Sequence, residues 1–373
     1  MSDVLIAGVG MAPFANHGPG KGIALARAAA TAALQDAGLT YADIDYVIVG
    51  TAHPLSPRAV YVAKDLGLTG VPVEHVTNAS ATGLAAIHSA SQAIRSGDAK
   101  RVLVVGMDSP ARAVPVEEII VSEGNFPPVV SFALWAKRRM HEVGTTREQL
   151  AKVIAKNWNY ARSNPYAARR APEEVTIERV LGSRMVADPF TSMMCTPWGE
   201  GASAAVLCSD DAWPAESKHP RIRLAASAFG SDSWSRELIL EGAIVGPPEL
   251  TRVTAEQALK SAGLKSSDVD VVQVHDAFAV EEFIYYELLG FSQPGETEKL
   301  VDEGAFGPGS RKRFGLPEFS TDGGLLARGH PGGPTGLAQI WETTRRLRGG
   351  DRVGMCHLLG AGSVCLVQIL VRD

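Results

Sequence analysis

Apolar and polar residues follow one another along this chain in blocks that predict strands and helices in turn. Several short apolar runs are bounded by polar or small residues, as buried strands are, at residues 4–9, 46–49, 202–208 and 271–274. Between them lie longer segments with apolar residues at helical spacing, such as the one that ends at Gly38. Alternating strands and helices favour mostly parallel sheets covered by helices, so we predict an α/β protein.

Two pairs of similar segments indicate an internal duplication. Residues 33–45 and 258–270 each run from an amphipathic helix through a glycine into a short acidic loop, at a constant offset. Farther along, Thr82-Gly83-Leu84-Ala85 matches Thr335-Gly336-Leu337-Ala338, and both runs lead to a Gly-Asp pair. Because the matches occur in the same order, we predict two similar halves, residues 1–215 and 216–373.

A segment of a different kind, residues 110–189, lies within the first half. It is rich in charge and long side chains, and it reads as helices with extended connections. We predict an inserted loop domain that is either a lid over a substrate or a purely structural excursion. Three large side chains in it are candidates for lining a pocket: Phe132, Trp135 and Trp158.

Composition and charge exclude several classes of protein. The 373 residues carry 36 basic and 41 acidic side chains, a net charge of −5, which gives no reason to expect a nucleic-acid partner. No apolar run approaches the roughly 20 residues of a membrane span, and the N-terminus lacks the basic start of a signal peptide. The four cysteines show neither CxxC nor zinc-site spacing, so we expect reduced cysteines, no metal and a cytoplasmic location.

The sharpest local feature is an abrupt turn from an apolar strand into a helix, in residues 73–86. Ser80 lies in this turn, where a side chain stands proud of the sheet beside exposed helix N–H groups. A cysteine there would have a lowered pKa and act as a nucleophile, whereas a serine needs a base beside it. The alternative is that Ser80 is simply a helix N-cap, and on local evidence alone the cap is favoured.

His330 lies in a glycine- and proline-rich loop just ahead of a helix. By the second duplication, this loop is the copy of the Ser80 turn, and in a two-fold arrangement the two turns would face one site. His330 is therefore a candidate base for the residue at position 80.

Two further stretches end predicted strands, where ligand sites of such folds lie. In the first, His275 could donate to a substrate carbonyl oxygen, for which a neutral imidazole would suffice, or could be a structural histidine. In the second, which runs from Cys356 through His357 to Gly360, the glycine could let the backbone approach a ligand or could simply form a turn.

Taken in order, these stretches resemble the thiolase superfamily, especially its sterol carrier protein 2-like (SCP2-like) and archaeal-type acetyl-CoA acetyltransferase branch. The resemblance covers essentially the whole chain and lies in four motifs: Asn78-Ala79-Ser80-Ala81-Thr82-Gly83, His275-Asp276-Ala277-Phe278, Gly329-His330-Pro331 and the glycine turn at residues 360–362. It implies two βαβαβαββ halves that form a five-layered αβαβα core, with a loop domain inserted in the first.

In that family a cysteine at position 80 takes an acyl group from a coenzyme A thioester. The resemblance implies His330 as its activator, both His330 and His275 in oxyanion holes, and a second cysteine that moves protons at the α-carbon. Here Ala277 and Leu358 occupy the two places where that cysteine occurs, so Cys356 or His357 is left as a substitute. Candidate substrate-lining positions are Asn78, Ala277, Phe278, Cys356 and Gly360.

Three hypotheses are compatible with the absence of cysteines at positions 80, 277 and 358. The chain is a thiolase-like acyl-CoA acyltransferase impaired or altered by Ser80, which is either natural or a Cys→Ser replacement. Alternatively, it is an acyl-CoA lyase that works by retro-aldol cleavage or decarboxylation without an acyl-enzyme, or a non-catalytic acyl-CoA-binding subunit. The resemblance implies acyl-CoA as substrate, no permanently bound cofactor, a homodimer or tetramer, and an associated OB-fold protein of the DUF35 type.

Overall fold

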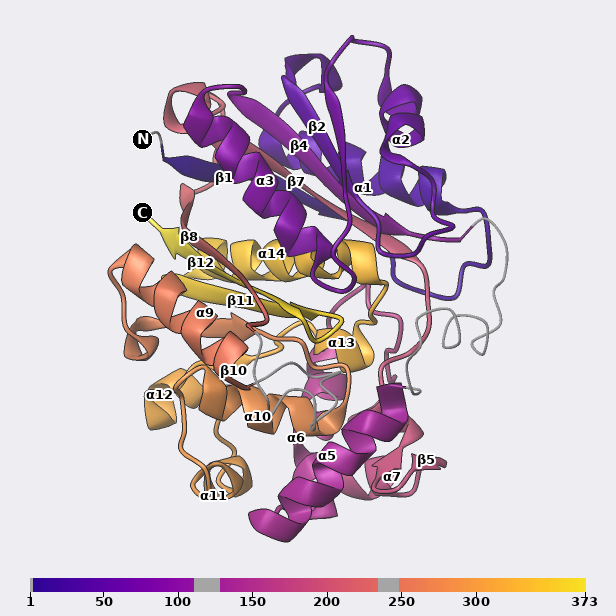
Figure 1. Cartoon of the computed structure of the whole chain (residues 1–373), viewed down its shortest axis with the longest axis vertical. Helices are drawn as coiled ribbons and strands as arrows, with labels where there is room; N and C mark the ends of the chain where they lie inside the picture. Colours follow the sequence, from indigo (N-terminus) through magenta and orange to yellow (C-terminus); the bar gives the residue numbers. More distant parts are fainter. Residues whose placement is uncertain (1–2, 111–127, 234–247) are drawn as a thin grey trace.

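The fold is known from a computed structural model that describes residues 3–110, 128–233 and 248–373 (Figure 1). Its main sheet has the strand order β10-β9-β11-β12-β8-β1-β7-β4-β2-β3. The order splits into two runs of five that meet where β1 contacts β8, at the single pair Leu5 and Arg223. The elements of the first half, apart from the insertion, are β1 (Val4–Met11), α1 (Gly22–Ala37), η1 (Tyr41–Asp43), β2 (Tyr46–Gly50), α2 (Ala59–Leu66), β3 (Val73–Val76), α3 (Thr82–Ser96), β4 (Arg101–Asp108), β7 (Gly201–Ser209) and η3 (Asp210–Ala212).

The second half repeats this plan. Its elements are β8 (Ile222–Ser231), α9 (Pro248–Ala262), η4 (Ser266–Asp268), β9 (Val271–Gln273), α10 (Ala279–Leu288), α11 (Thr297–Asp302), α12 (Ser310–Phe314), β10 (Glu318–Phe319), α13 (Gly324–Ala327), α14 (Gly332–Gly349), β11 (Val353–Gly360) and β12 (Val364–Arg372). In space the halves read β3-β2-β4-β7-β1 and β10-β9-β11-β12-β8, which is one order when each half is numbered from its own first strand.

Details of the chain path repeat as well. Helices α1 and α9 both end at a glycine with φ of +69°, Gly38 and Gly263. In each half, one aspartate after the following turn accepts two backbone N–H groups at the start of a neighbouring strand. Asp45 binds residues 100 and 101 at 3.0 and 2.9 Å, and Asp270 binds residues 352 and 353 at 2.8 and 3.0 Å. The structure thus contains the duplication that the sequence indicates.

The layers stack as helix, sheet, helix, sheet, helix. Helices α3 and α14 lie side by side between the two halves of the sheet, with α1 outside the first half and α9 and α10 outside the second (Figure 1). Where α3 and α14 cross, the equivalent glycines Gly83 and Gly336 meet. A Cβ on Gly336 would lie 2.4 Å from the backbone nitrogen of Leu84, so only glycine allows this approach. The close crossing brings the N-terminal ends of the two helices together.

The prediction of mostly parallel sheets was wrong. Parallel pairing is confined to β2 with its neighbours β3 and β4, and to β9 with its neighbours β10 and β11. Strands β1, β7, β8 and β12 pair antiparallel, because β12 follows β11 through a tight turn and β7 returns only after the insertion.

Between β4 and β7 the insertion extends a few residues beyond the predicted end at 189, and its described elements are α5 (Pro128–Glu142), α6 (Arg147–Ala161), α7 (Ile177–Leu181), β5 (Met185–Ala187), β6 (Phe190–Thr191) and the turn η2 (Ser192–Met194). Residues 111–127, at its start, lie outside the described residues. Although it belongs to the first half in sequence, the segment packs on the second. Arg139 of α5 makes buried ion pairs with Glu287 at 2.6 Å and Glu298 at 2.7 Å. Among the described residues, no helix has the length and hydrophobicity needed to cross a membrane.

Candidate active site

The turn between β3 and α3 places Ser80 at the crossing of the two halves. Ala79, just before it, has a φ of +46°, a left-handed conformation that is uncommon for a residue with a side chain. The N-cap of α3 is Ala81, and the Ser80 hydroxyl makes its hydrogen bond to His330 instead of to a helix N–H group. The N-cap interpretation of Ser80, favoured on local evidence, is therefore wrong.

Ser80, His330 and Thr335 form a directed chain of hydrogen bonds. The Ser80 hydroxyl lies 2.8 Å from Nε2 of His330, and Nδ1 of the same ring lies 2.8 Å from the Thr335 hydroxyl. That hydroxyl donates its single proton to the carbonyl of Pro331 at 2.6 Å. Nδ1 of His330 must therefore be the donor to Thr335, which leaves Nε2 to accept the proton of Ser80. The tautomer suits a base that activates a serine.

The surroundings of His330 keep its ring neutral and fix its loop. Burial lowers the pKa of His330 well below its ordinary value, and the nearby His275 and Arg328 lower it further. A neutral ring at pH 7 has the lone pair that a base requires. Asp108, at the end of β4, accepts the Gly333 N–H at 2.6 Å and so holds the start of α14 against the first half.

If Ser80 takes an acyl group, as the resemblance implies, Thr335→Val should slow that acylation by about 100-fold, since it frees His330 to adopt the other tautomer with little change in shape. The measurement is the rate at which acyl-CoA acylates the protein. Thr344→Val is the matched control, because in the described structure the buried Thr344 hydroxyl on the same helix has no hydrogen-bond partner. Equal rates for the two variants would remove Thr335 from this role.

A second histidine lies next to His330 and is held by a carboxylate. The rings of His275 and His330 are 5.3 Å apart and nearly perpendicular. Nδ1 of His275 lies 2.8 Å from Oε1 of Glu281, a fully buried residue on α10. Glu281 also accepts the Phe278 N–H at 2.9 Å and the Tyr285 hydroxyl at 3.2 Å. His275, which is 8% exposed, is thereby fixed in orientation.

The residues that follow His275 tie this loop to its neighbours. Asp276 accepts the Leu325 N–H at 2.8 Å and the Asn157 amide at 2.9 Å, so it joins the loop before His330 to helix α6. The carbonyl of Ala277 accepts the backbone N–H of Thr196 at 2.8 Å. Phe278 stacks on Phe132 of the insertion with ring centroids 4.6 Å apart.

Cys356 and His357 point to opposite faces of β11. The Cys356 thiol lies 3.2 Å from the Thr343 hydroxyl on α14, whereas the His357 ring lies 4.4 Å from that of Tyr285 on α10. Burial raises the pKa of Cys356 to about 12 and lowers the pKa of His357 to about 3, so both are neutral at pH 7. Neither side chain is hydrogen-bonded to Ser80 or His330.

Gly360, at the end of β11, lies directly against the backbone of the Ser80 turn. A Cβ on Gly360 would lie 2.4 Å from the carbonyl oxygen of Asn78. The close backbone approach that the sequence suggested is therefore made by the nucleophile turn itself. Asn78 contributes a second backbone contact, since its N–H donates to the Thr82 hydroxyl at 2.7 Å.

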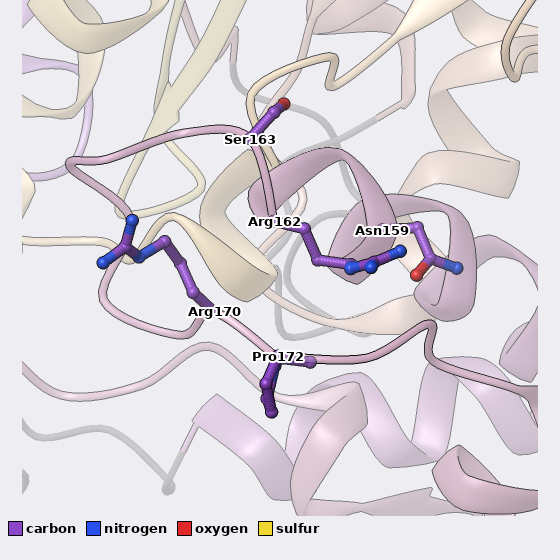
Figure 2. Close-up of a pocket in the computed structure, with 6 residues that line it drawn as sticks. Asn159, Arg162, Ser163, Arg170 and Pro172 are labelled. Atoms are coloured by element: carbon purple, nitrogen blue, oxygen red, sulfur yellow. The ribbon is translucent and has the colours of Figure 1, made fainter.

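A cavity of about 650 Å³ is lined by residues 159–172 of the insertion, and neither Ser80 nor the histidines line it. Figure 2 shows the Arg170 side chain extending away from Arg162, so the two guanidinium groups do not converge on one anion. Two candidate pocket residues of the insertion have other neighbours. Trp158 donates to the Met193 carbonyl at 3.2 Å, and Trp135 packs against the hydrophobic cluster that the insertion shares with the second half.

The sequence interpretation missed several residues that shape this site. Thr335 stood within the repeated Thr-Gly-Leu-Ala run, a signal that carried no role by itself. Glu281 lies three residues after the helix N-cap Phe278, the usual place for an acidic residue that binds back to the cap N–H. Gln339, whose amide donates to the carbonyls of Val274 at 3.0 Å and His357 at 3.2 Å, left no signal in the sequence.

Comparisons with known proteins show the family of this chain. The family model for the thiolase N-terminal domain matches residues 4–179, and the thiolase C-terminal domain-like model matches residues 233–354. Sterol carrier protein 2 of Gallus gallus is 34% identical over 98% of this chain and 71% of its own length. Acetyl-CoA acetyltransferase of Methanothermobacter thermautotrophicus is 32% identical over 100% of both chains.

A solved structure described as the Ltp2-ChsH2(DUF35) aldolase has the same fold, with a TM-score of 0.83 and 24% identity over 100% of this chain and 98% of that one. At that identity the likeness concerns the fold alone. The two family models and the relatives matched over nearly the whole length show that this chain belongs to the thiolase superfamily.

Proposed function

We propose that this chain is an acyl-CoA acyltransferase of the thiolase type in which Ser80 is the residue that takes the acyl group. The observation that carries the proposal is the chain of hydrogen bonds from Ser80 through His330 to Thr335, at 2.8 and 2.8 Å. It gives the hydroxyl the adjacent base that a serine nucleophile needs.

In the first half-reaction the Ser80 oxygen bonds to the thioester carbon while His330 takes the hydroxyl proton. The carbon–sulfur bond then breaks, and the CoA thiolate leaves with the proton that His330 holds. The product is an oxygen ester on Ser80, which is less activated than a thioester. Transfer onward to a carbon nucleophile or back to CoA is therefore slower than acylation, and the acyl-enzyme should accumulate.

The test is to incubate the chain with acetyl-CoA and measure its intact mass. We expect a gain of one acetyl group, mapped to Ser80 by peptide analysis, and none in Ser80→Ala. Absence of any gain, or equal labelling of Ser80→Ala, would overturn the proposal. The same measurement with propionyl-CoA and longer acyl-CoAs compares acyl groups.

A second candidate function is an acyl-CoA lyase that cleaves a β-hydroxyacyl-CoA by retro-aldol reaction. The observation that favours it is that no cysteine among the described residues is hydrogen-bonded to Ser80 or His330, and burial raises the pKa of all four thiols, Cys195, Cys208, Cys356 and Cys365. Here a base takes the β-hydroxyl proton, the Cα–Cβ bond breaks, and the acyl-CoA enolate is protonated. Ser80→Ala separates the candidates, since a lyase keeps its activity and an acyltransferase loses it.

The proposal extends to a partner protein. The solved aldolase with the same fold is described together with a DUF35 protein, and we propose an OB-fold partner of that type for this chain. Co-expression of the chain with such a protein, followed by size-exclusion chromatography, tests it. Elution of the two as separate species would argue against it.

A further inference from the structure

The chemistry proposed above has an unassigned step. Condensation, its reverse and retro-aldol cleavage all pass through an acyl-CoA enolate, so a group must remove or return a proton at the α-carbon. Ala277 and Leu358, at the two positions that the resemblance implies for the proton-moving cysteine, have no titratable group. His330 is committed to Ser80 by their 2.8 Å hydrogen bond.

His275 has the geometry of the missing group. Glu281 has three donors around its carboxyl group, from His275, Phe278 and Tyr285, and a carboxylate accepts all three. Nδ1 of His275 therefore carries a proton, and in the neutral ring Nε2 is the bare nitrogen. A neutral His275 held in this way is a base at Nε2. It cannot donate from Nε2 to a carbonyl oxygen, as the sequence interpretation assumed, unless it is first protonated.

We call His275 and Glu281 the dyad. The surroundings of His275 favour its use as a base at Nε2. His330 and His357 both interact electrostatically with His275, and burial lowers the pKa of both, so each is neutral at pH 7. Glu281 is fully buried and its charge faces His275 directly. When His275 takes a proton, the imidazolium forms against a carboxylate 2.8 Å away. That pairing stabilises the protonated ring, as a catalytic base requires.

We propose that His275 moves the α-proton of the acyl-CoA substrate and that Glu281 is the positioning residue that makes this possible. In one direction Nε2 takes a proton from the α-carbon, and the C–H electron pair becomes the enolate. In the other direction the imidazolium returns the proton and the ring is neutral again. This inference rests on the acyl-CoA chemistry proposed above and names the group that handles its carbanion.

The experiment is the exchange of the methyl protons of acetyl-CoA with D₂O, followed by NMR. We expect Glu281→Gln to slow the exchange about 100-fold while the Kd for acetyl-CoA stays the same. Glu281→Asp, which keeps a carboxylate beside the ring, should recover part of the lost rate, whereas a merely structural role would give no such recovery.

The matched control is Glu287→Gln, the same substitution on the same helix. Glu287 pairs with Arg139 at 2.6 Å, so this variant should lose stability but keep the exchange rate. Tyr285→Phe, which keeps Glu281 and removes one of its donors, should change the rate by less than about fivefold.

The outcomes separate this inference from the proposed function. Exchange in Glu281→Gln within threefold of the unaltered chain would overturn the role of Glu281. Acylation of Ser80 without any α-proton exchange would overturn the inference and leave the acyltransferase standing. Exchange that depends on Glu281 without acylation of Ser80 would support the dyad and favour the lyase. If Glu281→Gln does not fold, ¹⁵N NMR of the His275 ring in the unaltered chain decides, since an unprotonated Nδ1 would contradict the dyad.

Discussion

Ser80→Cys is expected to raise CoA-dependent cleavage of acetoacetyl-CoA by at least about 100-fold over the unaltered chain. A thiol is far more acidic than a hydroxyl, and the start of α3 at Thr82 favours negative charge beside position 80. The acyl group would also be held as a thioester, which remains activated towards a carbon nucleophile or a second CoA. The measurement is the loss of acetoacetyl-CoA in the presence and absence of CoA.

The control for Ser80→Cys is the same substitution combined with His330→Ala. If the new activity depends on the base 2.8 Å away, the double variant should lose most of it. A gain in Ser80→Cys means that the rest of the thiolase apparatus is intact and that the oxygen nucleophile limits thiolysis. No activity in either chain, with CoA esters still bound, would instead favour the lyase or a requirement for a partner protein.

Gly336→Ala is expected to lower the free energy of unfolding by about 3 kcal/mol. The added Cβ would lie 2.4 Å from the nitrogen of Leu84, and backbone cannot move aside as a flexible side chain does. Helices α3 and α14 would have to separate, and Ser80 would move from His330 with them. Acylation should therefore fall together with the midpoint of thermal unfolding.

Gly349→Ala is the matched control on the same helix. A Cβ at Gly349 meets nothing within 4 Å, so alanine should stabilise α14 by up to about 1 kcal/mol. Opposite signs for the two substitutions would show that the crossing of the helices, and not the helix propensity of α14, controls stability. Similar melting temperatures for the two variants would contradict the close contact at Gly336.

Residue patterns predicted much of the architecture because they repeat. The matching helix, glycine and acidic turn in each half indicated the duplication, and its symmetry placed the loop of His330 opposite the turn of Ser80. The structure does bring these two residues together. Short-range patterns of this kind depend on backbone preferences and burial, which a single sequence records directly.

The remaining features depend on contacts between distant segments. Glu281 reads as an ordinary acidic residue at the start of a helix, and only the fold shows that its second oxygen meets His275. The cap interpretation of Ser80 failed for a similar reason. A serine before a helix commonly binds that helix, and the competing partner here is 250 residues away. The antiparallel strands were missed because strand direction depends on the connections, which the apolar pattern does not record.

The inserted segment also sets an order on the folding of the chain during synthesis. Arg139 is made before its partners Glu287 and Glu298, which lie 148 and 159 residues farther along. Until the ribosome has added those residues, helix α5 has an unpaired guanidinium and its packing surface is uncovered. The site that joins the two halves is therefore completed late in translation. In a nascent chain that stops short of α11, the insertion lacks the surface of the second half on which it packs.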